Sequence, residues 1–208
     1  MKRLRRAIGL AVLAPLLGAA VGACGNDSNF TQTAVTTNIV VSANLFALTG
    51  TAPELPAGYE AISNTFVRPL VGQFSGAVNF DLAVDIRADG KVLLMPARAL
   101  VPFAPAPQSP DGRGAPSIAL LKSTQPFDLL TIAPTSDKYV ADSVTVASAG
   151  DTFLLKLISS GCVYGEPLYG KFVIDSIIVA ERRMVVRAMT NVNCGGYRSL
   201  ISGVIPKD

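Results

Sequence analysis

The 208-residue chain contains no histidine and no tryptophan. Without His, the chain lacks the commonest general base, the His-activated Ser or Cys nucleophile and the usual zinc ligand sets. The chain also has no Gly-x-Ser-x-Gly, Ser-x-x-Lys, phosphate-binding glycine loop or calcium-loop pattern. We therefore expect no metal and no cofactor. Catalysis could depend only on carboxylates, and the missing Trp, a favoured sugar-stacking residue, argues against a glycan-cleaving site.

An excess of charge of one sign is lacking as well. Four of the 18 Lys and Arg residues lie in the first six positions, which leaves 14 basic against 15 acidic groups in the rest of the chain. A surface so close to neutral gives no electrostatic basis for binding nucleic acid. Because half of the residues are apolar and only 16% are charged, we expect a folded domain with a real core.

The first 24 residues, MKRLRRAIGLAVLAPLLGAAVGAC, follow the plan of a secretory signal. A basic start is followed by an apolar run over residues 7–21 and by the small residues Gly22 and Ala23. The apolar run is too short for a membrane span. Residues 1–23 are therefore predicted to be a signal peptide.

The segment Val21-Gly22-Ala23-Cys24 resembles the lipobox of bacterial lipoprotein precursors, and the resemblance covers only residues 1–24. It implies that the Cys24 thiol is diacylated, with palmitate-type chains, and that Cys24 becomes the first residue of the mature protein. Two or three acyl chains hold a protein durably on a bilayer, whereas one chain binds only marginally. The implied protein is a lipoprotein of the bacterial cell envelope, tethered to the membrane by its N-terminal lipid.

Two details of this region qualify the resemblance. Gly22 is tolerated at its lipobox position but is not the favoured residue, so cleavage that leaves Cys24 as a free thiol, or an uncleaved anchor, are the alternatives. Gly25 stands where an Asp retains inner-membrane lipoproteins in well-studied envelopes, which favours the outer membrane. The leaflet, periplasmic or surface-facing, is left open.

The two remaining cysteines, Cys162 and Cys194, form an even pair in an oxidising compartment. We predict a disulfide between them. The alternative is two unrelated buried thiols.

The rest of the chain is predicted to be one domain preceded by a linker. Residues 24–37 are polar and lack helical periodicity, as expected of a flexible tether. Residues 38–208 contain about ten short strand signals with frequent turn residues, which predicts an all-β antiparallel sandwich, with a β-barrel as the alternative. The Pro-rich segment 102–116 is expected to be an exposed loop or, alternatively, a linker between two small domains.

The strongest local pattern covers residues 78–101. Apolar residues alternate from Phe80 to Ile86, and Asp89-Gly90 suits a two-residue type I′ turn. A turn of that length predicts the pairs Ile86–Leu93, Val84–Met95, Leu82–Ala97 and Phe80–Ala99 on one face. It also predicts a charge pair of Asp81 with Arg98 on the other face.

Weaker strand signals follow the same logic. Single strands are expected at 39–48, 59–67, 117–121, 127–132 and 197–204. Two more hairpins are expected, one joining 139–147 to 152–158 and one joining 172–180 to 184–190, the second with its register left open.

The predicted bridge brings together two loops that are rich in Tyr and Gly. Tyr and Arg favour recognition surfaces, and a disulfide orders loops before they bind. We therefore expect a binding surface made by Tyr164, Glu166, Tyr169, Tyr197 and Arg198. The alternative is that these tyrosines cover the edge of the core and that the bridge only staples the last strands.

These observations favour a binding or structural module that recognises a protein or an envelope polymer. A carboxylate-dependent glycan hydrolase using acids such as Asp81, Asp85 and Glu166 is the first alternative. A carrier of small apolar ligands is the second, and it requires an open barrel interior.

Overall fold

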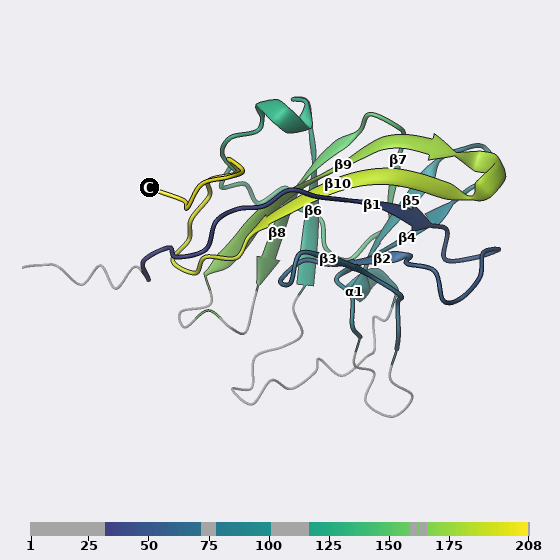
Figure 1. The fold of residues 1–208 in the computed structure, drawn as a ribbon, viewed down its shortest axis with the longest axis horizontal. Coiled ribbons are helices and arrows are strands. Elements are labelled where there is room, and N and C mark those ends of the chain that lie inside the picture. Colours follow the sequence, from purple (N-terminus) through teal and green to yellow (C-terminus); the bar gives the residue numbers. More distant parts are fainter. Residues whose placement is uncertain (1–31, 72–77, 101–116, 159–161, 163–165, 208) are drawn as a thin grey trace, which may run out of the picture. The chain divides into compact units, whose positions relative to one another are not determined.

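Strands form where β-branched and aromatic residues lie between turn residues, and they account for most of the fold (Figure 1). The computed structural model describes residues 32–71, 78–100, 117–158, 162 and 166–207. Within these residues there are ten strands: β1 (Val41–Phe46), β2 (Gly58–Glu60), β3 (Thr65–Val67), β4 (Leu82–Ile86), β5 (Val92–Pro96), β6 (Ser117–Ser123), β7 (Thr145–Ala147), β8 (Thr152–Ile158), β9 (Pro167–Ile178) and β10 (Arg183–Asn191).

The strands build two antiparallel sheets of five strands each within the described residues. The first sheet has the order β1-β10-β9-β8-β6 and the second the order β3-β2-β4-β5-β7. The sheets are not closed into a barrel. The predicted all-β sandwich is therefore confirmed, and the barrel alternative is wrong.

The main core lies between the two sheets. The second sheet contributes Tyr59, Leu82 and Leu94, and the first contributes Phe153 and Phe172, all fully buried. The Tyr59 hydroxyl lies 2.9 Å from the Thr190 hydroxyl of β10 and donates to Asn64 Oδ1 at 2.6 Å. Burial raises the pKa of this phenol well above its usual range. A buried polar contact thus links the two sheets inside an apolar core.

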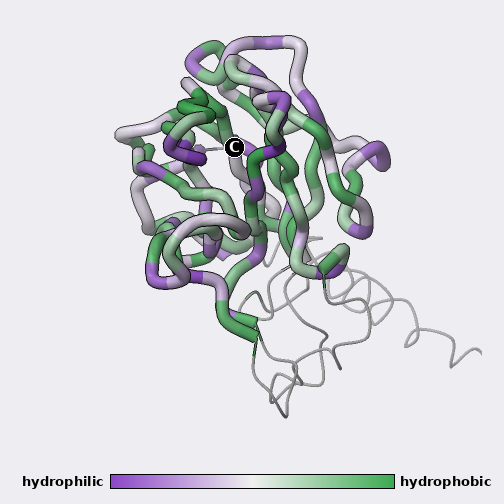
Figure 2. The backbone as a smooth tube through the Cα atoms, turned by 90° about the vertical axis from the view of Figure 1, so that its right-hand side faces the viewer, coloured by the Kyte–Doolittle hydropathy of each residue, from purple (hydrophilic) through white to green (hydrophobic). Residues whose placement is uncertain are grey.

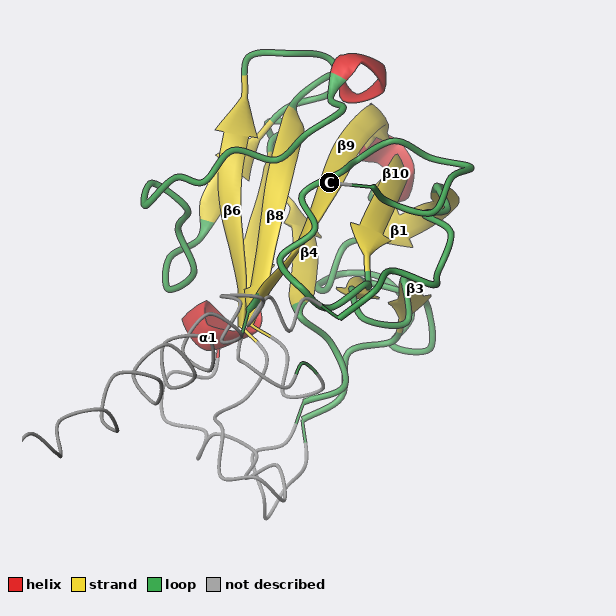
Figure 3. Cartoon of the chain, turned by 90° about the vertical axis from the view of Figure 1, so that its left-hand side faces the viewer, coloured by secondary structure: helices red, strands yellow, loops and turns green. Residues whose placement is uncertain are grey.

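The first sheet buries its other face as well, because irregular chain covers it (Figure 3). A 3-10 helix at Phe127–Leu129 packs there, and buried Lys171 of β9 donates to the Phe127 and Leu130 carbonyls at 3.0 and 2.9 Å. The Phe127 ring also lies 4.6 Å from the Lys171 Nζ and 4.8 Å from the Arg187 guanidinium carbon. These contacts fix the covering segment by hydrogen bonds and cation–π attraction. Figure 2 shows hydrophobic stretches through the body of the domain and hydrophilic residues at several of its outer turns.

The predicted hairpin of β4 and β5 is present, but its predicted register is wrong. Gly90 donates to the Arg87 carbonyl at 3.0 Å, and Arg87 donates to the Lys91 carbonyl at 2.8 Å. Gly90 has a φ of 78°, whereas Asp89 is not among the described residues with positive φ. The connection is therefore a three-residue loop with a glycine bulge, since a type I′ turn needs positive φ at both central residues.

This one-residue difference turns the β5 side chains to the opposite face of the sheet. Val84 pairs with Leu94 and Ile86 with Val92, so Val92 and Leu94 point into the core. The predicted pair of Asp81 with Arg98 is wrong, because Asp81 lies opposite Ala97 and Arg98 belongs to the short helix α1 (Ala97–Leu100).

Of the other local predictions, one hairpin is confirmed, whereas another hairpin and several single strands differ from the structure. The hairpin of β9 and β10 is confirmed, and Arg182 takes the left-handed conformation that the missing turn glycine would have supplied. The predicted hairpin across residues 148–151 is wrong, because β7 pairs with β5 whereas β8 pairs with β6 and β9. The strands expected at 127–132 and 197–204 are absent from the described residues, where a 3-10 helix and the isolated bridge Ile132–Ser199 occur instead. The strand expected at 59–67 is divided by a turn into β2 and β3.

The predicted signal peptide, the Pro-rich segment 102–116 and the tether up to residue 31 lie outside the described residues.

Candidate functional site

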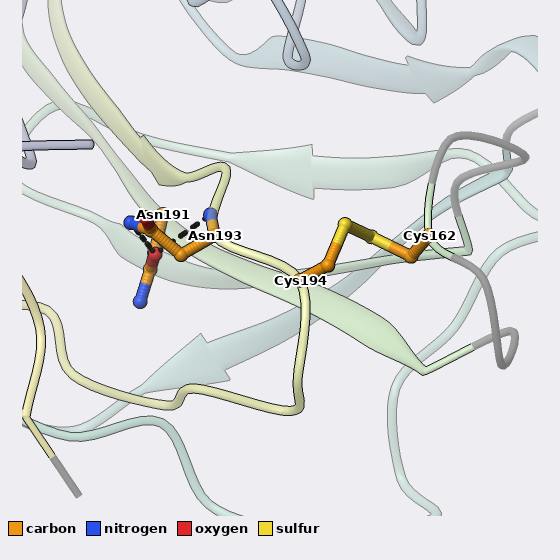
Figure 4. The surroundings of a disulfide bond; sticks show 4 residues. All are labelled: Cys162, Asn191, Asn193 and Cys194. Atoms are coloured by element: carbon orange, nitrogen blue, oxygen red, sulfur yellow. Dashed lines mark hydrogen bonds between the residues drawn. A yellow bond between two sulfur atoms is a disulfide. The ribbon is translucent and has the colours of Figure 1, made fainter. Parts of the chain in front are cut away.

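The bridged region is the part of the domain that the sequence singles out, and the structure joins Cys162 and Cys194 as predicted. The two Cα atoms are 5.3 Å apart, and the residues are 32 positions apart in the sequence. Cys162 is buried in the main core, and the partly buried Cys194 packs against that core. The bridge therefore connects the chain that leaves β8 to the loop that follows β10 (Figure 4).

An asparagine pair shapes the loop after β10. Asn191 Nδ2 donates to the Tyr197 and Ser199 carbonyls at 3.2 and 3.1 Å. Its Oδ1 accepts from the Asn193 backbone N–H at 3.1 Å and from Asn193 Nδ2 at 2.9 Å. Both side chains are buried. Because its side chain accepts and donates at the same time, Asn191 closes the loop and orients Asn193 (Figure 4).

Asn193 in turn holds the N-terminal segment of the domain. Its Oδ1 accepts from the backbone N–H groups of Val35 and Thr36 at 2.9 and 2.8 Å, and its Nδ2 donates to the Thr36 carbonyl at 2.8 Å. The amide thus pairs with a peptide backbone about 157 positions away, as a neighbouring strand would.

Tyr197 and Gly195 complete this attachment. The buried Tyr197 hydroxyl accepts from the Ala34 N–H at 3.1 Å. Gly195 has a φ of 111°, and a Cβ at this position would lie 2.9 Å from the Gln32 carbonyl oxygen. Only glycine allows this conformation and this close approach. Residues 34–36, counted in the sequence as part of the tether, are therefore hydrogen-bonded to the loop beside the bridge.

The residues predicted to form a binding surface lie in different environments. Tyr169 is buried on the covered face of the first sheet, where burial raises the pKa of its phenol, and Tyr197 is buried as described. Glu166 and Arg198 are half-buried. Glu166 lies against Gly196, where a Cβ would be 3.2 Å from its Oε2, and Arg198 donates to the Ala133 carbonyl at 3.2 Å. Tyr164 lies outside the described residues, as does Cys24.

The carboxylates singled out in the sequence are held within the fold. Asp81 is buried and accepts from the Ala61 N–H at 2.7 Å; burial raises the pKa of its carboxyl to about 6. Asp85 accepts from Arg182 at 3.0 Å and from the Thr49 hydroxyl at 2.8 Å. Asp81 is therefore a buried hydrogen-bond acceptor, and Asp85 forms an ion pair with Arg182.

Sequence reasoning missed Asn191 and Asn193, because their partners are backbone groups brought together only by the fold. The Asn-Val-Asn-Cys run beside a predicted bridge was the available signal, since Asn side chains pair readily with backbone groups.

Two further observations concern the described residues only. They contain no cluster of three or more His, Cys, Asp or Glu residues that could hold a metal ion. Their helices are all too short or too polar to cross a membrane.

The fold and the bridge define the class of protein as a disulfide-bridged antiparallel β-sandwich. Comparison with models of protein families, with curated proteins and with solved structures finds no match to this chain.

Proposed function

We propose that the protein is a lipid-anchored binding or structural module of the bacterial cell envelope, attached through Cys24. The observation that supports this proposal is the attachment of residues 34–36 to Asn193 and Tyr197 beside the bridge. A domain held by its N-terminal lipid has to transmit any pull on the anchor through this segment. Hydrogen bonds to a loop that is closed by a disulfide suit that task.

The anchor and the fold are close together along the chain. Gln32 follows Cys24 by eight positions, so the first described residue lies within about 29 Å of the lipidated cysteine even when the chain is fully extended. Such a domain works at a membrane surface, where it holds a protein or an envelope polymer.

Partner recognition is proposed for the surface around Glu166 and Arg198, together with Tyr164. The burial of Tyr169 and Tyr197 does not favour them as contact residues. The two charged residues are half-buried and of opposite sign. Removing a partly desolvated charge of this kind from an interface costs about 2 kcal/mol or more of binding free energy, because its partner is left unpaired.

The alternatives find less support. A hydrolase needs two accessible acids, whereas Asp81 is buried and Asp85 is ion-paired. A carrier of apolar ligands needs an open interior, whereas large side chains such as Phe153 and Phe172 occupy the space between the sheets.

Chemical cross-linking on intact envelopes, read by mass spectrometry, tests the proposal. We expect one partner to recur with the wild-type protein and to be lost with the Cys24→Ser form. We also expect the double variant Glu166→Ala/Arg198→Ala to capture less than about a tenth as much partner, since central interface residues dominate affinity.

The matched control is Arg87→Ala/Asp89→Ala, which removes one exposed acid–base pair from the β4–β5 turn. It should capture the partner as the wild type does. Cross-links that are scattered, or that are equally frequent in the Cys24→Ser form, would refute the proposal.

A further inference from the structure

A set of aliphatic side chains is exposed near both ends of the described chain and on the segment that contains Ile132. Val35 is 77% exposed, and Ile39, Ile132, Ile201, Val204 and Ile205 are exposed as well. We call these six residues the aliphatic patch. Single exposed aliphatics are ordinary, but clusters of them mark binding surfaces.

Backbone contacts place these residues on neighbouring segments. Asn38 donates to the Val204 carbonyl at 3.0 Å, and Gly203 donates to the Asn38 carbonyl at 2.8 Å. Ile132 forms a β-bridge with Ser199, and Leu200 donates to the Thr131 carbonyl at 2.8 Å. Ile201 and Ile132 are exposed, whereas their sequence neighbours Leu200 and Ala133 are buried, so the two isoleucines point away from the core.

The segments that carry these residues are uncharged. Residues 32–40, 129–136 and 199–206 contain no Asp, Glu, Lys or Arg. Exposed aliphatic residues on uncharged segments suit the boundary between the headgroups and the acyl chains of a bilayer.

We infer that the aliphatic patch rests on the lipid bilayer, so that the anchored domain lies against the membrane surface in one orientation. The inference rests on the proposed anchor at Cys24. Val35 belongs to the patch and follows Cys24 by only eleven positions, so the patch is held within about 40 Å of the lipid. Because the tether is this short, the patch stays close to the bilayer, and even weak apolar contacts with it can form.

The absence of Trp from the chain provides a clean test, because a single introduced Trp is then the only indole. The lipidated full-length protein with Ile201→Trp is reconstituted into phosphatidylethanolamine/phosphatidylglycerol vesicles, with and without brominated acyl chains. Val204→Trp serves as a second probe. If the patch reaches about 5–10 Å into the interface, brominated lipid should lower the Trp emission about twofold.

The matched control is Val146→Trp on strand β7, at a position with 50% exposure against 48% for Ile201. Its emission should be the same in both kinds of vesicle. The double variant Ile201→Glu/Val204→Glu should increase proteolysis of the vesicle-bound domain, whereas Val144→Glu/Val146→Glu should not.

The outcomes separate the two proposals. Protein that floats with the vesicles but shows equal quenching at positions 201 and 146 would overturn the patch and leave the anchor intact. Protein that does not float would overturn both. If the emission of the Ile201→Trp variant changes with protein concentration, but not with brominated lipid, a second copy of the chain is the occupant and the inference is overturned as well.

Discussion

Asn193 is the residue on which the attachment of the N-terminal segment chiefly depends. One side-chain amide satisfies three backbone groups of Val35 and Thr36 and is itself oriented by Asn191. The amide of Asn193 thus takes the place of backbone hydrogen bonds between two segments of the chain that do not pair as strands.

Replacing Asn193 by Ala should release residues 34–36. The three backbone groups lose their partner, so we expect a loss of about 2 kcal/mol in unfolding free energy. Hydrogen exchange at Val35 and Thr36 should become at least about tenfold faster, while β9 and β10 stay protected.

Asn79→Ala is the control, because Asn79 likewise pairs with backbone groups, those of Leu70 and Arg68, in an exposed loop. It should leave exchange at residues 34–36 unchanged. Equal exchange in Asn193→Ala and the wild type would show that the segment is held by something else.

Asp81 makes the stability of the domain depend on pH. Burial raises its carboxyl pKa from 3.8 to about 6, so between these values the folded chain binds more protons than the unfolded chain. Unfolding free energy therefore falls as pH rises through this window, by about 3 kcal/mol at most.

Urea unfolding of the wild type and of Asp81→Asn at pH 4, 5, 6 and 7 measures this effect. The unfolding free energy of the wild type, relative to that of Asp81→Asn, should fall as pH rises from 4 and should level off above about pH 6. Asp142→Asn, at an exposed acid, is the matched control for the loss of a carboxylate. A wild type that gains stability relative to Asp81→Asn from pH 4 to 6 would contradict the account.

At the scale of elements, the hairpins show what a sequence pattern can and cannot specify. Alternation identified β4, because a half-buried strand repeats every two residues, whereas runs of β-branched residues without alternation indicated β9 and β10. It could not fix the β5 register, because Leu93, Leu94 and Met95 are all apolar and suit either face. The choice between the two registers therefore depended on Gly90 alone. It could not be made, because a two-residue loop and a three-residue loop can both end with the same Asp-Gly pair.

The turn at residues 148–151 shows a second limit. Gly150 has positive φ and Asp151 donates to the Ser148 carbonyl at 3.1 Å, as a hairpin turn would require. The chain nevertheless passes from one sheet to the other there. Which sheet a strand joins is decided by contacts distant in sequence, and local turn residues do not reveal it.

The disulfide ties the loop after β10 to the chain that follows β8. Closing a loop with a sequence separation of 32 residues should contribute about 3 to 4 kcal/mol by restricting the unfolded chain. Denaturant unfolding with and without reductant, and of Cys162→Ser/Cys194→Ser, should show this loss. A change of less than about 1 kcal/mol would mean that the loop is already ordered without the bridge.

At the scale of the whole molecule, the sequence established the fold class and the bridge, and it misjudged the role of the bridged loops. The tyrosines were expected on the surface because Tyr is frequent in binding sites, yet Tyr169 and Tyr197 are buried. Nothing local could show that residues 34–36 would lie beside Asn193. The candidate site is thus an attachment point in the structure, and recognition by Glu166 and Arg198 is part of the proposal.

The attachment gives the protein a continuous path from the proposed anchor into the fold. It runs from Cys24 along the linker to residues 34–36, then through Asn193 to the bridge and the main core. All functional proposals here depend on the first link of this path.

Mass spectrometry of the N-terminal peptide, taken from protein purified from the membrane fraction, tests that link most directly. The account predicts a peptide that begins at Cys24 and carries a diacylglyceryl group, with or without a third acyl chain. A peptide that begins at Cys24 without lipid, or an uncleaved chain that begins at Met1, would contradict the account.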